Sequence, residues 1–282
     1  KLGANVQGYR EGQRVIAGAI CPSFTSYACQ DGCSAQDGGH HAHGYKPMGG
    51  WRFGNTIDGA QAEYLRVPDA QTNLSPVPDG LTDDQVLMCP DIMSTGFAGA
   101  ESANIKIGDS VAVFAQGPIG LCATAGARLR GAGLIIAVDG VDERLKMAKK
   151  MGADVALNFR QVDVVAEILK LTGGRGVDAS IEALGLQQTF EQALRVIKPG
   201  GTLSSLGVYS ESLTIPLDAF SAGLGDHRIV TSLCPGGKER MRRLMQIIDS
   251  GRLDLGPMVT HRYPLEKIVD AYDLFSHQRD GV

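Results

Sequence analysis

The sequence predicts an α/β protein, in which a doubly wound parallel sheet is joined to a β-rich domain. Across residues 95–233, short apolar runs alternate with segments of helical period. Such repeated strand–helix–strand units form a parallel sheet with helices on both faces. Residues 1–94 are instead rich in Gly, Pro and Asp around short apolar runs, which is typical of strands joined by long loops. Helical periodicity dominates the last segment, residues 234–282.

The hydrophobic pattern places each element in turn. In the β-rich part, the apolar runs at residues 14–20 and 62–67 are expected to be strands, and a helix is expected over 93–103. The second zone is predicted to hold strands at 110–115, 135–139, 154–158, 177–184 and 202–208. Helical segments are predicted between them at 119–132, 142–153, 163–174 and 189–201. The last segment is predicted to hold helices at 238–251 and 265–275 around a short strand at 258–263.

Charge and hydropathy argue against several classes of function. The formal net charge is −4 and the basic residues are dispersed, so nothing favours binding to nucleic acid. No apolar run approaches the roughly 18 residues that cross a bilayer, and residues 1–15 lack the apolar core of a signal peptide. The six cysteines are too sparse for a disulfide scaffold of this size. We therefore expect a cytoplasmic protein.

A buried strand, a glycine turn and a helix start follow one another at residues 111–121. The pattern is G-x-G-x-x-G, except that Ala115 takes the first glycine position. Gly117 would let the backbone approach a pyrophosphate, and Gly120 would let the helix pack closely on the sheet. Pro118 and Ile119 lie at the helix start, whose N-terminus would face the phosphates. This pattern indicates a Rossmann domain with a nicotinamide dinucleotide as its cofactor.

The next predicted strand ends in Asp139, 19 residues after Gly120. A carboxylate there can accept a hydrogen bond from the ribose 2′-OH and would repel a 2′-phosphate. NAD(H) is therefore favoured over NADP(H), although the nearby Arg144 could swing toward a phosphate. The alternative interpretation is a plain α/β domain, in which the glycine turn binds nothing and Asp139 only caps a helix.

Five strings carry a resemblance to a known family, at residues 49–78, 89–101, 114–139, 195–202 and 233–241. They resemble the zinc-dependent medium-chain alcohol dehydrogenases, in particular the bacterial secondary-alcohol (isopropanol-type) branch. The resemblance implies a GroES-like catalytic domain split by the Rossmann domain, in a homotetramer or homodimer. On this basis, residues 1–94 are a partial GroES-like domain, 95–233 the Rossmann domain and 234–282 an incomplete return segment. The Cys and His–Glu zinc ligands of the family lie upstream of the position matching Lys1, so the chain is expected to be a fragment.

The resemblance assigns roles to three residues of this sequence. Asp91 matches the family's downstream zinc ligand, Thr95 a residue beside the nicotinamide ring, and Trp51 a residue of the substrate pocket. A carboxylate oxygen is a competent zinc ligand. Without the resemblance, Asp91 would be a helix N-cap, Thr95 a residue at a helix start and Trp51 a residue of the core. Cys89, next to Asp91, is interpreted as a core residue.

A cluster of possible metal ligands lies further upstream, at Cys21, Cys29, Cys33, His40, His41 and His43. Many members of the family hold a second, structural zinc nearby with four cysteines at close, near-regular intervals. Here the gaps between the three cysteines are eight and four residues, and C-x-x-C is absent. We therefore expect a loop with free thiols and solvated histidines, with a structural zinc as the alternative.

Backbone contacts to NAD are expected at the ends of two later strands, near Ala183–Gly185 and Gly207–Tyr209. Glu182 lies at the same edge of the predicted sheet. In the complete enzyme, zinc would act as a Lewis acid on the alcohol oxygen, and the alcohol carbon would give a hydride to NAD⁺. The reverse reaction reduces a ketone or aldehyde. Two alternatives are a zinc-free quinone or enoyl reductase of the same superfamily, which Asp91 disfavours, and an NAD(H)-binding protein without turnover.

Overall fold

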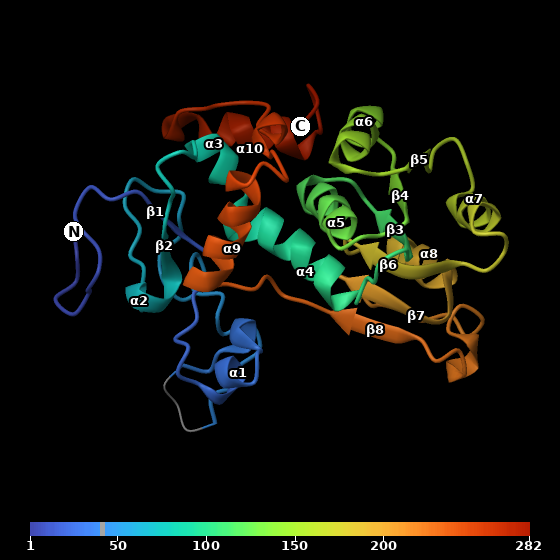
Figure 1. Ribbon diagram of the computed structural model, residues 1–282, viewed down its shortest axis with the longest axis horizontal. Helices are drawn as coiled ribbons and strands as arrows, with labels where there is room; N and C mark the ends of the chain where they lie inside the picture. The colour runs from blue at the N-terminus through green and yellow to red at the C-terminus, as the bar shows by residue number, and fades with distance from the viewer. Residues whose placement is uncertain (40–42) are drawn as a thin grey trace. The chain divides into compact units, whose positions relative to one another are not determined.

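The computed structural model describes residues 1–39 and 43–282 of the chain. It forms two compact units (Figure 1). Unit 1 consists of Lys1–Ser94 and Leu233–Val282, and unit 2 consists of Thr95–Ser232. His40 and His41, two of the histidines considered as metal ligands, lie outside the described residues.

Unit 2 is built on a six-stranded parallel sheet with the order β5-β4-β3-β6-β7-β8. Its strands are β3 (Ser110–Phe114), β4 (Leu134–Asp139), β5 (Val155–Asn158), β6 (Val177–Glu182), β7 (Ile197–Ser205) and β8 (Arg228–Thr231). Every residue of β3 is buried because the strand is central and covered on both faces. The predicted doubly wound α/β fold is confirmed.

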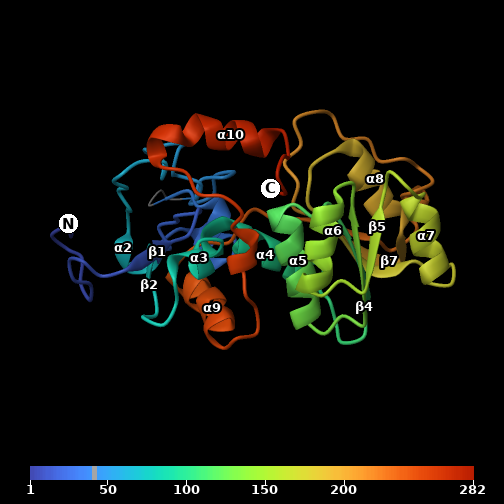
Figure 2. The same ribbon diagram turned by 90° about the horizontal axis from the view of Figure 1, so that it is seen from above.

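Four helices connect the strands of this sheet: α5 (Pro118–Leu129), α6 (Asp142–Met151), α7 (Val164–Leu171) and α8 (Gln187–Arg195). Helix α5 packs beside α6, and α7 packs beside α8, so one pair covers each face of the sheet (Figure 2). The chain enters the sheet at β3, builds outward through β4 and β5, and then returns to the other side of β3 with β6. Ligands of open α/β sheets bind at this reversal, beyond the carboxyl ends of the strands.

Unit 1 contains a two-stranded antiparallel sheet of β1 (Val15–Ala17) and β2 (Leu74–Pro76). Its helices are α1 (Tyr27–Gln30), α2 (Ala70–Asn73), α3 (Asp83–Val86), α9 (Lys238–Asp249) and α10 (Ile268–Ser276). Helix α9 buries Met241, Leu244, Met245 and Ile248, one turn apart, and packs on β1, β2 and α3. A π-helical turn at Cys89–Met93 leads directly into α4 (Ser94–Ser102).

Two predicted strands are not formed. Residues 62–67 lie in an irregular segment, and the Tyr64 side chain is 88% exposed. Met258 ends a short 3₁₀ turn, and residues 259–263 are also irregular. Both segments have the apolar content of a strand, but a strand also needs a partner strand, and neither segment pairs with one among the described residues. The helix predicted from Met93 begins as the π-helical turn at Cys89.

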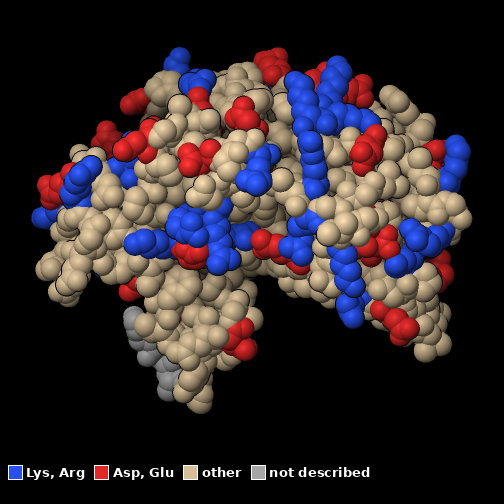
Figure 3. Space-filling model, viewed as in Figure 1, with Lys and Arg blue, Asp and Glu red and all other residues tan. Residues whose placement is uncertain are grey.

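The surface carries both signs of charge. On the face shown in Figure 3, basic and acidic side chains are interspersed. Ion pairs in the described part of the chain include Arg195 with Asp218 and Arg242 with Glu239. None of the helices in the described part of the chain has the length and apolarity needed to cross a bilayer.

Candidate functional site

The turn after β3 is held from inside by a buried glutamine. Gln116 donates from Nε2 to the Val113 carbonyl (3.0 Å) and accepts from the Thr124 hydroxyl (3.0 Å). Ala115 has a φ of +69°, in the left-handed region, and its N–H donates to Val138 on the neighbouring strand. The turn thus adopts the backbone of a glycine turn although its first position is alanine.

The two glycines of this turn have different surroundings. A Cβ on Gly120 would lie 1.9 Å from the Ala115 carbonyl oxygen, so only glycine lets α5 start this close to the strand. A Cβ on Gly117 would have open space, with Arg144 Nη1 as its nearest neighbour at 3.8 Å. Gly117, Pro118 and Ile119 are half-buried at the N-terminus of α5, which has twelve residues. This open cradle of backbone amides fits a pyrophosphate.

Asp139 ends β4 beside this turn and is only 6% exposed. One carboxylate oxygen accepts from the Gln116 N–H at 2.6 Å. The other accepts from the N–H groups of Gly140 and Val141, at 2.7 and 2.9 Å. The carboxylate therefore joins the glycine turn to the end of β4, which the sequence alone did not indicate.

The ends of β6 and β7 meet at the same edge of the sheet. Ala183 follows β6, and its N–H donates to Phe114 at the end of β3. A Cβ on Gly207 would lie 2.2 Å from the Gly185 nitrogen, so the two loops touch backbone to backbone. Glu182, the last residue of β6, is fully buried beneath them. All the predicted cofactor residues thus lie in unit 2, at the carboxyl edge of its sheet.

Asp91 lies in the π-helical turn of unit 1 and is exposed. The segment that leads into α9 holds this turn in place. Ser94 donates from its hydroxyl to the Pro235 carbonyl (2.7 Å), and Arg240 donates to the Ser94 hydroxyl (3.0 Å) and carbonyl (2.8 Å). The Pro90 carbonyl accepts from the Ala19 N–H. Single π-helical turns are frequent at functional sites.

Trp51, the other predicted site residue of unit 1, is 44% exposed, so the core interpretation of this residue is wrong. The Trp51 carbonyl accepts from Asn55 Nδ2 at 2.9 Å. Thr95 is 7% exposed in the first turn of α4 and belongs to unit 2.

Metal ligands do not gather in the described part of the chain, where no group of three or more His, Cys, Asp or Glu side chains could hold an ion. Asp91 is one donor, and zinc requires three or four protein donors, so the described residues do not by themselves form a zinc site. All six cysteines are free thiols. Burial raises the pKa of Cys89 to about 12, which keeps this side chain a neutral thiol.

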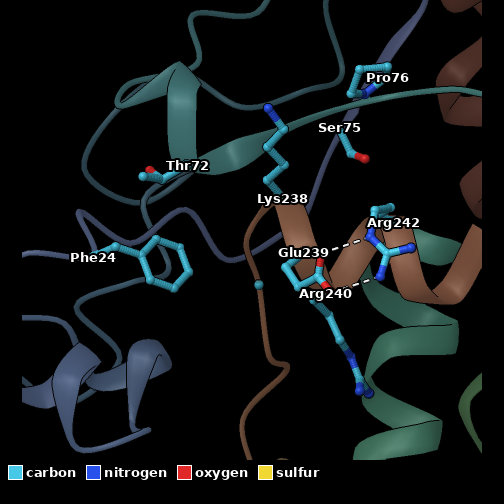
Figure 4. A pocket seen from close by; sticks show the side chains of 9 residues that line it. Phe24, Thr72, Ser75, Pro76, Lys238, Glu239, Arg240 and Arg242 are labelled. Atoms are coloured by element: carbon cyan, nitrogen blue, oxygen red, sulfur yellow. Dashed lines mark hydrogen bonds and ion pairs between the residues drawn. The ribbon is translucent and has the colours of Figure 1, made fainter.

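Unit 1 also contains a cavity of about 660 Å³, beside the N-terminal part of α9 (Figure 4). Its basic side chains are already engaged. Lys238 Nζ lies 5.0 Å from the centre of the Tyr9 ring, Arg242 pairs with Glu239, and Arg240 points away toward Ser94. None of the predicted site residues lines this cavity.

Comparison with known proteins identifies the family. Residues 1–79 match the alcohol dehydrogenase GroES-like domain, and residues 118–250 match the zinc-binding dehydrogenase family. An alcohol dehydrogenase of Cupriavidus necator is 74% identical over 100% of this chain and 79% of its own length. The NADP-dependent isopropanol dehydrogenase of Thermoanaerobacter brockii is 38% identical over 93% of this chain and 73% of its own length.

Solved structures agree with these sequence matches. An alcohol dehydrogenase from Thermus sp. ATN1 is 31% identical, with a TM-score of 0.84 over 99% of this chain and 78% of that one. The apo form of zinc-dependent alcohol dehydrogenase 2 from Streptococcus pneumonia is 30% identical, with a TM-score of 0.86 over 99% of this chain and 76% of that one. The resemblance found in the sequence is confirmed, and the chain belongs to the zinc-binding medium-chain alcohol dehydrogenase family of oxidoreductases.

Proposed function

We propose that the protein transfers a hydride between NAD(H) and a secondary alcohol or its ketone. The family is that of alcohol dehydrogenases, and relatives at 37–38% identity are named isopropanol dehydrogenases. When bound, the nicotinamide supplies the hydride chemistry itself. The residues of unit 2 bind and orient it: Gly117 leaves room for the pyrophosphate, and Gly120 brings the N-terminus of α5 to the sheet.

The placement of Asp139 is the observation that carries the choice of cofactor. The isopropanol dehydrogenases named above are NADP-dependent, so this chain's own residues are needed to decide. A carboxylate offers about four acceptor positions, and three of those on Asp139 are filled by backbone amides. The remaining position suits a ribose 2′-OH, which donates, and not a 2′-phosphate, which is anionic.

Replacement of this charge tests the proposal. In the variant Asp139→Asn, we expect the ratio of the NADPH and NADH dissociation constants to fall about tenfold, or ~1.4 kcal/mol, because the repulsion of the 2′-phosphate is removed. Titration followed by NADH and NADPH fluorescence gives both constants. Asp142→Asn removes a nearby exposed charge at the start of α6 and should leave the ratio nearly unchanged. Equal effects of the two variants would show that Asp139 does not select the cofactor.

We propose further that Asp91 is one donor to zinc, that Thr95 contacts the nicotinamide ring and that Trp51 forms part of the substrate pocket. The π-helical turn supports the first assignment because it leaves the Asp91 side chain exposed. In a protein extended upstream to the length of its relatives, Asp91→Ala should lower both the zinc content of the purified protein and its oxidation of 2-propanol. Asp79→Ala removes an exposed acid from the same unit and should change neither. A zinc content unaffected by Asp91→Ala would remove Asp91 from the ligand set.

The protein is also proposed to act as a cytoplasmic homo-oligomer. Six free thiols suit a reducing compartment. Large apolar side chains exposed on unit 2, such as Val208 (82%) and Leu224 (85%), are the kind that a second subunit covers. A mass near the 29.8 kDa of one chain in light scattering would contradict the oligomer.

A further inference from the structure

We propose that Glu182 is a positioning residue that holds the two loops bordering the nicotinamide half of the cofactor. The inference rests on the proposed binding of NAD(H) at this edge of the sheet. Because Glu182 is 0% exposed, its side chain acts on a bound cofactor only through the loops that it holds.

One oxygen of the Glu182 carboxylate fixes the loop after β6. Oε1 accepts from the N–H groups of Leu184 (2.9 Å) and Gly185 (2.8 Å) and from the Thr189 hydroxyl (2.7 Å). Two of these donors are backbone groups of the loop itself, and the third lies in the first turn of α8. The carboxylate thereby sets the path of the chain from the end of β6 to the start of the next helix.

The other oxygen fixes the loop after β7. Oε2 accepts from the Tyr209 hydroxyl (2.8 Å) and, at 3.4 Å, from the Ser205 hydroxyl. These two hydroxyls are also 2.8 Å from each other. Burial, which is the largest effect, and the nearby Glu182 charge raise the pKa of Tyr209, so that its hydroxyl keeps its proton and remains a donor. The Tyr209 ring packs edge-on against the Phe190 ring, with 6.1 Å between the ring centres.

The two loops touch each other at Gly185 and Gly207. A Cβ on Gly207 would lie 2.4 Å from Glu182 Oε2 and 2.2 Å from the Gly185 nitrogen. Gly185 has a φ of +96°, and a Cβ there would lie 2.5 Å from the Val208 carbonyl oxygen. The loops therefore pack backbone to backbone directly over the carboxylate. Loss of the carboxylate would leave buried N–H groups without acceptors, and the loops would have to move to satisfy them.

The position of these loops indicates which half of the cofactor they affect. Asp139, on the β4 side of the reversal point, is the proposed partner of the adenosine ribose, and Gly117 lies at the proposed pyrophosphate. The nicotinamide half then extends to the β6 and β7 side. Displaced loops should thus weaken the binding of NADH while leaving the binding of AMP unchanged.

The test compares Glu182→Ala and Glu182→Gln with Asp178→Asn. Asp178 is a partly buried carboxylate on the same strand, near the opposite end, where it accepts from Ser110 and Lys198. We expect the NADH dissociation constant to rise about tenfold in Glu182→Ala. A smaller rise is expected in Glu182→Gln, whose amide keeps one acceptor oxygen while the hydroxyls of Tyr209 and Ser205 can turn to accept. Asp178→Asn should keep its NADH affinity within about twofold.

Each outcome bears on a different claim. AMP affinity should be unchanged in all three variants, and circular dichroism checks that they fold; if Glu182→Ala does not fold, Glu182→Gln carries the test. If the folded Glu182 variants bind NADH like Asp178→Asn, or lose AMP and NADH in equal proportion, Glu182 does not position these loops. If the unmodified protein binds AMP and NADH equally weakly, the proposed function fails before this inference is tested.

Discussion

Ala115 occupies a backbone conformation that normally belongs to glycine. Its φ of +69° puts the methyl group close to the following carbonyl, which costs roughly 1–2 kcal/mol. Hydrogen bonds hold Ala115 in this conformation. Its N–H donates to a carbonyl of β4, and the side-chain amide of the next residue, Gln116, donates to one neighbour and accepts from another. These hydrogen bonds offset the strain of the turn, so that alanine can replace glycine at this position.

The variant Ala115→Gly should therefore be more stable than the natural chain. Relief of the strain exceeds the greater chain entropy that glycine brings to the unfolded state, roughly 0.4–1 kcal/mol, so we expect a gain of about 0.5 kcal/mol in chemical denaturation. Ala125→Gly, inside α5, is the control and should lose about 1 kcal/mol. A loss of the same size in both variants would mean that Ala115 is not strained.

Asp178 makes the stability of unit 2 depend on pH. Burial by itself would raise its pKa, but hydrogen bonds from Lys198 and from the Ser110 N–H and hydroxyl lower it to about 2. A carboxyl whose pKa is lower in the folded state stabilises the protein above its ordinary pKa and loses that contribution as the pH falls. The contribution is on the order of 2 kcal/mol, present above pH ~4 and lost toward pH ~2.

Urea unfolding of the natural protein and Asp178→Asn tests this dependence. The difference in the free energy of unfolding should be full at about pH 5 and shrink steadily toward about pH 2.5. A difference that stays constant over this range would mean that Asp178 contributes through packing and not through its charge.

At the scale of elements, local pattern predicted unit 2 better than unit 1. Strands β3 and β4 are continuous apolar runs between turn residues, and such runs are buried wherever a parallel sheet forms. Residues 62–67 also contain residues that favour strands, but they pair with no strand in the described part of the chain. Local sequence does not show whether a partner strand is present. The π-helical turn at Cys89–Met93 was also missed, since it depends on distant contacts such as that from the Ala19 N–H to the Pro90 carbonyl.

In the candidate site too, features set by local sequence could be predicted and features set by distant contacts could not. The roles proposed for Gly117, Gly120 and Asp139 could be predicted from the sequence because they depend on spacing along the chain. The contacts from Gln116 to Asp139 and from Tyr209 to Glu182 could not be predicted, because these donors reach the carboxylates from other loops of the sheet. The position of Glu182, an acidic residue at the carboxyl end of a buried strand, was the one available signal.

At the scale of the molecule, unit 2 is continuous in sequence whereas unit 1 is assembled from two separated stretches. A ligand that binds unit 2 alone stabilises the folded state of that unit by mass action, by about 2.7 kcal/mol at 100 times its dissociation constant. The two units therefore need not share one unfolding transition.

Hydrogen exchange with NADH should show this difference. We expect slower exchange in peptides covering residues 111–121, 134–141 and 182–209, and a smaller change in the peptides of β1 and β2. AMP, used as the control ligand, should protect the first two peptides and leave the third unchanged. Protection confined to unit 1 would place the cofactor elsewhere.

The division of unit 1 into two stretches also affects the order of events during protein synthesis. All six strands of unit 2 have been made once residue 231 is added, and this unit can then fold. Helix α9, which covers β1 and β2, is complete only at Asp249, 18 residues after the end of β8. At roughly 5–20 residues per second, these 18 residues take roughly 1–4 s to make. In that interval the apolar residues of the first stretch lack their covering helix, which makes this stretch the part of the nascent chain in greatest need of a chaperone.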